Sequence, residues 1–258
     1  MPHFVLAGIK VESLTGFLRS LDKPAVRIQD GFKQELLCDR CEQLFSNWES
    51  ILAKEIFAPL TQDPDATIRY GATFSRFALS VLWRVLVWRS NTFLAVSPEF
   101  KGHIETVERE WRQFLLGEAM KPGRASCHAV IFAQKLVLGV GAPAQATSDG
   151  FQRYFQSTVD VNVISDGRQP FVYAKLGRLL IFGFVPEGTG YRNSRVALRS
   201  STLGPGAYQL PPAIFGTLLH NAANIFAAIK SLSPRQKQRI DDSIARTLQG
   251  RRGSLAGK

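Results

Sequence analysis

The residues from Phe74 to Trp88 place the strongest constraint on how this chain folds. Seven apolar side chains recur there at steps of three and four residues, which is the spacing of one face of an α-helix. The other faces carry Trp83, Leu86 and Val87 and are apolar as well. A helix that is apolar almost all round is buried on most sides. This segment is therefore predicted to be the central helix of the fold.

Further helices are predicted on both sides of the central helix. One begins near Cys38 and ends at Pro59, and another begins with Ser97 and Pro98 and closes at Gly117. Two more are expected at the C-terminal end. The first is opened by Pro211 and Pro212 and reaches Lys230, and the second follows the capping box at residues 233–236.

The period of the sequence changes after Ser126, where β-forming residues become frequent. Strands are predicted in direct succession, and Lys175–Arg178 is interpreted as a hairpin turn with a glycine where positive φ is needed. Consecutive strands without intervening helices favour an antiparallel sheet. The fold class predicted is α+β, with a mainly helical N-terminal half, a small antiparallel sheet and two C-terminal helices.

The charge of the chain is concentrated at its C-terminal end. The net charge is +11 over 258 residues, and residues 230–258 hold eight Lys/Arg against two Asp/Glu. A basic surface attracts phosphate polymers such as nucleic acid through counterion release. The alternative partners are a membrane surface and an acidic protein, and a further alternative is a solvated tail without a partner. The residues predicted to bind nucleic acid are Arg235, Lys237, Arg239, Arg246, Arg251 and Arg252.

The cysteine content and the apolar stretches predict a cytoplasmic protein. Three cysteines are too few, and odd in number, for a secreted disulfide framework. The first ten residues lack the pattern of a signal peptide. The most apolar stretch contains Arg84 and Arg89, whose charges are costly in hydrocarbon, so no membrane span is expected.

Cys38 and Cys41 form a CxxC motif at the predicted start of a helix. Their spacing lets both sulfurs face one metal ion, and a helix N-terminus favours the thiolates that zinc needs. Zinc wants four ligands, however, and no other Cys or His stands at ligand spacing. Three interpretations of the motif remain open. It is a zinc site that is either degraded or completed by a partner, a pair of ordinary buried thiols, or a redox pair.

Other polar residues are weaker candidates. Cys127 and His128 are neighbours on a predicted strand, so their side chains point to opposite faces and cannot form a dyad. His220, Asn221 and Asn224 share one flank of a predicted helix and are interpreted as helix-surface or interface polar residues, with ligand binding at the sheet edge as the alternative. No phosphate loop, dinucleotide fingerprint or nucleophile elbow is present.

Several segments resemble a group of poorly characterised bacterial proteins that are similar to HNH-endonuclease-type treble clefs. They are Met1–Val5, Leu14–Arg19, Val26–Gly31, Leu36–Glu42, Phe77–Arg84 and, more loosely, Lys175–Arg178. In that pattern a first CxxC and a Ser-His-Ile-Ile-Pro-type segment precede the second CxxC, which opens a helix. The resemblance implies that residues 1–58 form a truncated treble-clef-like subdomain. The residue pattern predicts an α+β body over 59–248 and a disordered basic tail over 249–258.

The chain departs from that pattern at its start. Pro2 aligns with the proline of the Ser-His-Ile-Ile-Pro segment, so the first CxxC and the motif histidine have no counterpart, and His3 is displaced from the pattern. In HNH nucleases this histidine activates water while the metal holds the scissile phosphate. The resemblance therefore implies a nucleic-acid-binding protein of HNH-like ancestry without its own cleavage activity. Alternatives are a protein-interaction component of a bacterial complex, for example in defence against mobile elements, and a metal-dependent nuclease with a clipped N-terminus.

Overall fold

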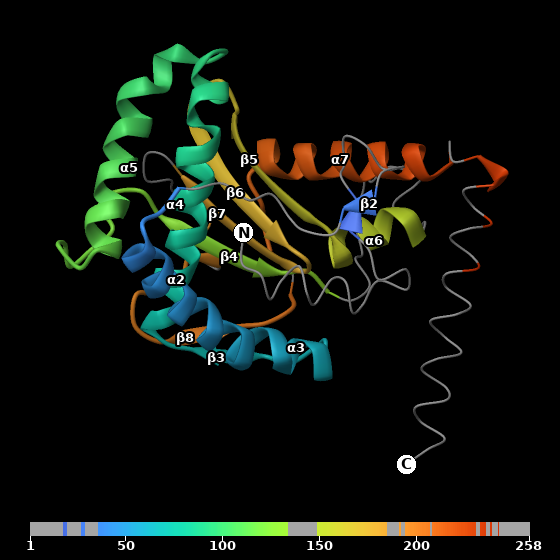
Figure 1. Ribbon diagram of the computed structural model, residues 1–258, viewed down its shortest axis with the longest axis horizontal. Helices are drawn as coiled ribbons and strands as arrows, with labels where there is room; N and C mark the ends of the chain where they lie inside the picture. Colours follow the sequence, from blue (N-terminus) through green and yellow to red (C-terminus); the bar gives the residue numbers. More distant parts are fainter. Residues whose placement is uncertain are drawn as a thin grey trace.

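The computed structural model of this protein describes part of the chain. The described residues are 18–19, 27–28, 36–133, 149–184, 191, 194–206, 208–230, 233–235, 238 and 242. They form a mixed α/β structure in which a small antiparallel sheet lies between two sets of helices (Figure 1). The predicted α+β class, with helices in the N-terminal half and after the sheet, is confirmed.

The main sheet has four strands, in the order β4-β7-β6-β5, and every pair in it is antiparallel. The predicted hairpin is present, but its turn is only Gly177 and Arg178. Gly177 has φ of 62°, and a side chain there would press on the backbone oxygen of Gln156. The strands are β4 (Cys127–Ile131), β5 (Val159–Ser165), β6 (Pro170–Leu176) and β7 (Leu179–Phe184).

Two short ribbons accompany the sheet. Strand β1 (Leu18–Arg19) pairs with β2 (Arg27–Ile28), and β3 (Ile68–Tyr70) pairs with β8 (Ser201–Leu203), both in antiparallel register. The second ribbon joins residues that lie far apart in the sequence, and it brings the loop before β8 alongside the N-terminal helices (Figure 1).

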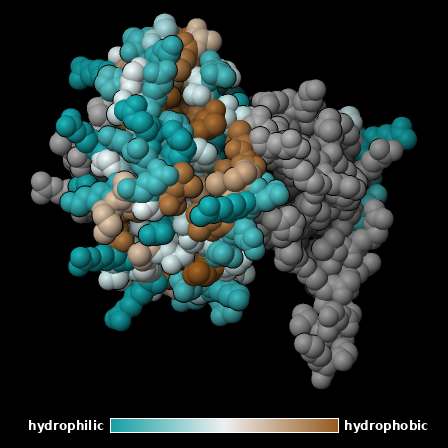
Figure 2. Space-filling model, turned by 60° about the vertical axis from the view of Figure 1, so that its left-hand side comes forward, coloured by the Kyte–Doolittle hydropathy of each residue, from teal (hydrophilic) through white to brown (hydrophobic). Residues whose placement is uncertain are grey.

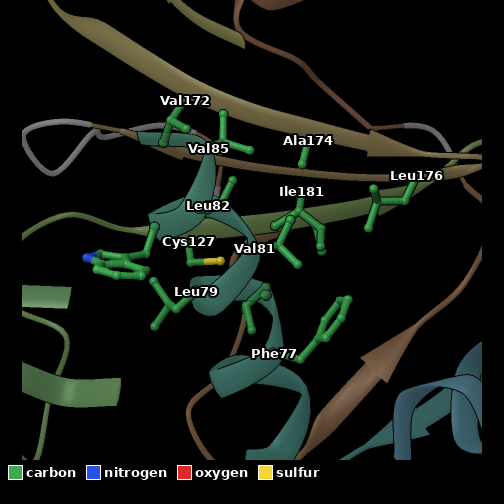
Figure 3. Packing of buried hydrophobic residues seen from close by; sticks show 14 of the residues in the cluster. Phe77, Leu79, Val81, Leu82, Val85, Cys127, Val172, Ala174, Leu176 and Ile181 are labelled. Carbon is green, nitrogen blue, oxygen red and sulfur yellow. The ribbon is translucent and has the colours of Figure 1, made fainter. Parts of the chain in front are cut away.

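Helix α4 (Ala72–Leu94) is the central helix that the sequence predicts. Figure 3 shows its apolar side chains packed against the inward residues of β4, β6 and β7. Phe77, Leu79 and Leu82 are completely buried. Helix α5 (Lys101–Leu115) packs on α4 and follows the short 3-10 turn η2 (Pro98–Phe100).

The N-terminal helical stretch continues past the proline that was expected to end it. Helix α2 (Asp39–Leu52) leads into a π-helical turn, η1 (Ala53–Phe57), and then into α3 (Ala58–Gln62). In the wider π turn the Ala58 N–H bonds to the carbonyl of Ala53, five residues back. Pro59 then occupies the first turn of α3, where its missing N–H costs nothing. The prediction that the helix ends at Pro59 was wrong for this reason.

The opposite face of the sheet is covered by α6 (Asp149–Ser157) and α7 (Pro212–Lys230). Helix α7 matches the predicted segment, and Ile214, Leu218 and Ala222 are buried on its inner face. Helix α6 was not predicted; it buries Phe151, Tyr154 and Phe155 against the aromatic side chains of β6 and β7. The sheet therefore has two separate hydrophobic cores, one on each face.

Some predictions concern residues outside the described part. Most of the treble-clef-like start before residue 36, except the β1–β2 pair, belongs to this group, as do the basic tail and most of the second C-terminal helix. The proposed division at residue 58 stays a prediction. None of the helices in the described part is long and apolar enough to cross a membrane. Hydrophilic side chains predominate on the face shown in Figure 2, and hydrophobic ones lie among them.

Candidate functional site

The two cysteines of the CxxC motif lie at the start of α2, as predicted. Cys38 is the N-cap residue and is exposed, and Cys41 is partly exposed one turn later. Polar groups of Cys41, first its backbone N–H, lower the pKa of Cys38 below its ordinary value. The pKa of Cys41 is raised, chiefly by the side chain of Cys38. Cys38 is therefore the thiol of the pair that ionises first.

The described residues supply only two zinc ligands. They contain no cluster of three or more His, Cys, Asp or Glu side chains able to hold a metal ion. The third cysteine, Cys127, lies in the core beside α4 (Figure 3), where burial raises its pKa and keeps it a thiol. His3 lies outside the described residues. A tetrahedral zinc site would need two more ligands from that part of the chain or from a partner.

The zinc prediction is tested by the metal content of the purified chain. If Cys38 and Cys41 bind zinc, we expect about one zinc per chain, or about one per two chains when two copies share a four-thiolate site. The double variant Cys38→Ser, Cys41→Ser should contain none, and Cys127→Ser should keep the wild-type content. Equal zinc in the wild type and the double variant would exclude this motif as the metal site.

The residues predicted to contact nucleic acid lie beyond α7. Arg235 is exposed at the start of the next helical segment. Lys237, Arg239, Arg246, Arg251 and Arg252 lie outside the described residues, so whether these six side chains come together stays a prediction.

His128 and Cys127 point to opposite faces of β4, as the strand geometry predicts. The His128 ring is buried against Phe182 and lies 3.0 Å from the hydroxyl oxygens of both Ser126 and Ser194. Burial, with help from the charge of Arg195, lowers the pKa of His128 to about 4. A neutral, enclosed imidazole with both nitrogens bonded has a structural role.

A buried polar cluster lies between the sheet and the two helices on its second face. Its centre is Asp160 on β5, which is only 8% exposed. One carboxylate oxygen, Oδ2, accepts three hydrogen bonds: from the Tyr154 hydroxyl of α6 at 2.5 Å, the Tyr173 hydroxyl of β6 at 3.2 Å and the Asn221 amide of α7 at 2.8 Å. Burial and the Asp160 charge raise the pKa of both tyrosines, so both hydroxyls stay protonated donors.

Lys175 lies directly opposite Asp160 across the β5–β6 pair and is completely buried. Its Nζ donates to the carbonyl oxygen of Thr158 at 3.0 Å and to the hydroxyl of the same residue at 2.9 Å, and it lies 4.7 Å from the centre of the Tyr154 ring. Burial lowers the pKa of Lys175 to about 7, although the nearby Asp160 charge acts in the opposite direction.

Sequence reasoning missed this cluster. Lys175 was placed in the hairpin turn, but it is the last inward residue of β6 on the face of Phe171 and Tyr173. The period-two alternation of these three residues was the available signal. Of the three residues interpreted as helix-surface or interface polar residues, Asn221 faces Asp160 at the contact between α7 and the sheet. Its neighbours His220 and Asn224 are exposed and bonded to each other at 2.9 Å.

The cluster fastens four elements to one another. Asp160, Lys175 and both tyrosines are buried and hydrogen-bonded within the cluster, so we interpret the cluster as the polar contact that holds α6 and α7 on the sheet. No known protein family matches this chain, and no curated protein or solved structure matches it either.

Proposed function

We propose that this chain is a nucleic-acid-binding protein that uses its basic C-terminal segment to contact the phosphate backbone. The observation that carries the proposal is the charge distribution, with eight Lys/Arg and two Asp/Glu in the last twenty-nine residues. Each cation placed near a phosphate releases condensed counterions, and this term supplies most of the sequence-independent affinity for nucleic acid.

The attachment of α7 to the folded body supports the proposal. Its inner face is buried in the second core and its Asn221 side chain bonds to Asp160. The chain then continues from Lys230 toward the exposed Arg235. Because α7 is fixed at several points, cations that follow it start from a defined place on the protein.

The HNH-like ancestry belongs to the same proposal and rests on the resembling segments. Binding of nucleic acid, and not its cleavage, is the activity proposed here. The cytoplasmic location is proposed on the cysteine content. The protein-interaction role and the clipped nuclease stay predictions, because no contact of the described residues favours either.

The test is the salt dependence of binding to a short duplex DNA, measured by fluorescence anisotropy between about 50 and 200 mM salt. We expect the affinity of the wild-type chain to fall steeply over this range. Neutralising Arg235, Lys237, Arg239, Arg246, Arg251 and Arg252 together should reduce the slope of log K against log salt by up to about 5, at about 0.9 for each phosphate contact.

A control variant with the same net charge as the C-terminal variant distinguishes a local contact of the C-terminal segment with DNA from a general attraction of the whole protein to DNA. It neutralises six exposed cations of the body: Lys54, Lys101, Arg109, Arg112, Lys121 and Arg168. This variant should keep a slope close to the wild-type slope. If both variants lose affinity equally, only the total charge matters, and a wild-type chain that does not bind DNA at all would end the proposal.

A further inference from the structure

A second basic surface lies on the folded body, apart from the C-terminal segment. Residues 188–229, which precede that segment, contain three arginines and no Lys, Asp or Glu. Part of this stretch, residues 194–203, forms strand β8 and the segment that leads into it. The described part of the stretch therefore presents cations to solvent without acidic residues of its own.

This segment is held firmly on two neighbouring strands. The Val196 N–H donates to the Cys127 carbonyl of β4 at 2.8 Å, and the Ala197 N–H donates to the Tyr70 hydroxyl of β3 at 3.0 Å. Val196 and Leu203 are buried, so the segment is anchored through the residues between its cations. Arg195 and Arg199 thus extend from a fixed backbone.

The β3–β8 ribbon adds a third arginine to the same region. Arg69 is exposed between the buried Ile68 and Tyr70, and it is the register partner of the exposed Thr202. Ser200 and Ser201 are exposed as well. Guanidinium groups interspersed with hydroxyls are the side chains that most often contact phosphate and sugar in protein–nucleic acid interfaces.

The acidic residues closest in sequence lie toward the other end of the ribbon. Asp63 and Asp65 precede β3, whereas Arg199 precedes β8, and the antiparallel register places these two approaches at opposite ends. Within the described residues, neither Arg69 nor Arg199 takes part in an ion pair. Their charges are therefore available to an anionic partner.

We infer that the β3–β8 ribbon and the segment before it form a second nucleic-acid contact, in which Arg69, Arg195 and Arg199 bind the sugar-phosphate backbone of a duplex. This inference rests on the proposed function and extends it from the C-terminal segment to the folded body. The occupant follows from charge complementarity, since several arginines on a rigid surface match the evenly spaced phosphates of a duplex.

The test uses the full chain carrying Arg69→Ala and Arg199→Ala, with the same duplex DNA and the same salt series. We expect the slope of log K against log salt to decrease by about 2, at about one unit for each lost phosphate contact. The variant Arg69→Lys, Arg199→Lys keeps both charges and should recover most of the slope. The matched control is Arg109→Ala, Arg168→Ala, which removes two exposed charges elsewhere and should leave the slope unchanged.

The outcomes separate this inference from the function on which it rests. If the ribbon variant binds with the wild-type slope while the C-terminal variant loses its slope, the inference is overturned and the proposed function stands. If the ribbon variant loses slope and the C-terminal variant does not, the ribbon alone carries the binding. A wild-type chain that does not bind DNA overturns both. Circular dichroism spectra matching the wild type confirm that each variant is folded.

Discussion

Replacing Asp160 with alanine is expected to lower the free energy of unfolding by about 3–5 kcal/mol. The substitution removes the carboxylate oxygen that accepts hydrogen bonds from Tyr154, Tyr173 and Asn221. Each buried donor left without an acceptor costs about 1–3 kcal/mol. It also removes the negative charge next to the buried Lys175. Urea denaturation followed by circular dichroism measures the loss.

The control for Asp160→Ala is Asp166→Ala, in the exposed turn between β5 and β6. There a carboxylate oxygen accepts from the backbone N–H groups of Arg168 and Gln169 at 2.8 and 2.9 Å, in contact with water. The net value of such exposed bonds is about 1 kcal/mol. Equal losses for the two variants would mean that the cluster contributes no more than a surface turn does.

A double-mutant cycle shows whether the cluster acts as a unit. Tyr154→Phe removes one hydroxyl but keeps the ring beside Lys175. If Asp160 and Tyr154 stabilise the fold through their shared hydrogen bond, the double variant should lose less than the sum of the single losses. Hydrogen exchange of α7 should increase in the same variants, because Asn221 joins this helix to Asp160.

The elements that the sequence predicted well are those with strong local signals. Helix α4 follows from apolar residues on every face, since such a helix has no stable place except the core. The β6–β7 hairpin follows from Gly177, whose positive φ suits a tight two-residue turn. Helix α7 begins at Pro212 because proline fits the first turn of a helix.

The elements that were predicted wrongly or missed depend on neighbours that local sequence does not reveal. Proline predicts the end of a helix, but the π turn at Ala53–Phe57 places Pro59 where it needs no hydrogen bond. Helix α6 has only nine residues, and its aromatic side chains are stabilised by the sheet against which they pack.

The CxxC motif and the Asp160 cluster also differ in how much of each the local sequence reveals. The CxxC motif could be placed at a helix start because both cysteines lie within one turn. The Asp160 cluster could not be predicted, since its members come from α6, β5, β6 and α7 and meet only after the sheet and both helices have assembled. A lysine at the end of a strand is usually exposed, but Lys175 contacts the Tyr154 ring of α6 and Thr158, which follows that helix.

Replacing Lys175 with methionine is expected to remove a large part of the pH dependence of stability. The pKa of Lys175 is about 7 in the folded chain against an ordinary value of 10.5. The folded state therefore binds fewer protons than the unfolded state between these values, and stability falls as pH decreases from about 10.5 to about 7. Below pH 7 both states are protonated and this contribution, about 5 kcal/mol in total, no longer changes.

The measurement compares the free energy of unfolding of the wild type and Lys175→Met at several pH values between 7 and 9. Over this range the wild type should gain about 2 kcal/mol that the variant lacks. Lys101→Met, whose side chain is 70% exposed, is the control and should follow the wild type. Methionine has nearly the shape of lysine without its charge, so a packing defect would shift stability equally at every pH. A constant difference between wild type and Lys175→Met would therefore contradict the lowered pKa and leave only a packing role for this side chain.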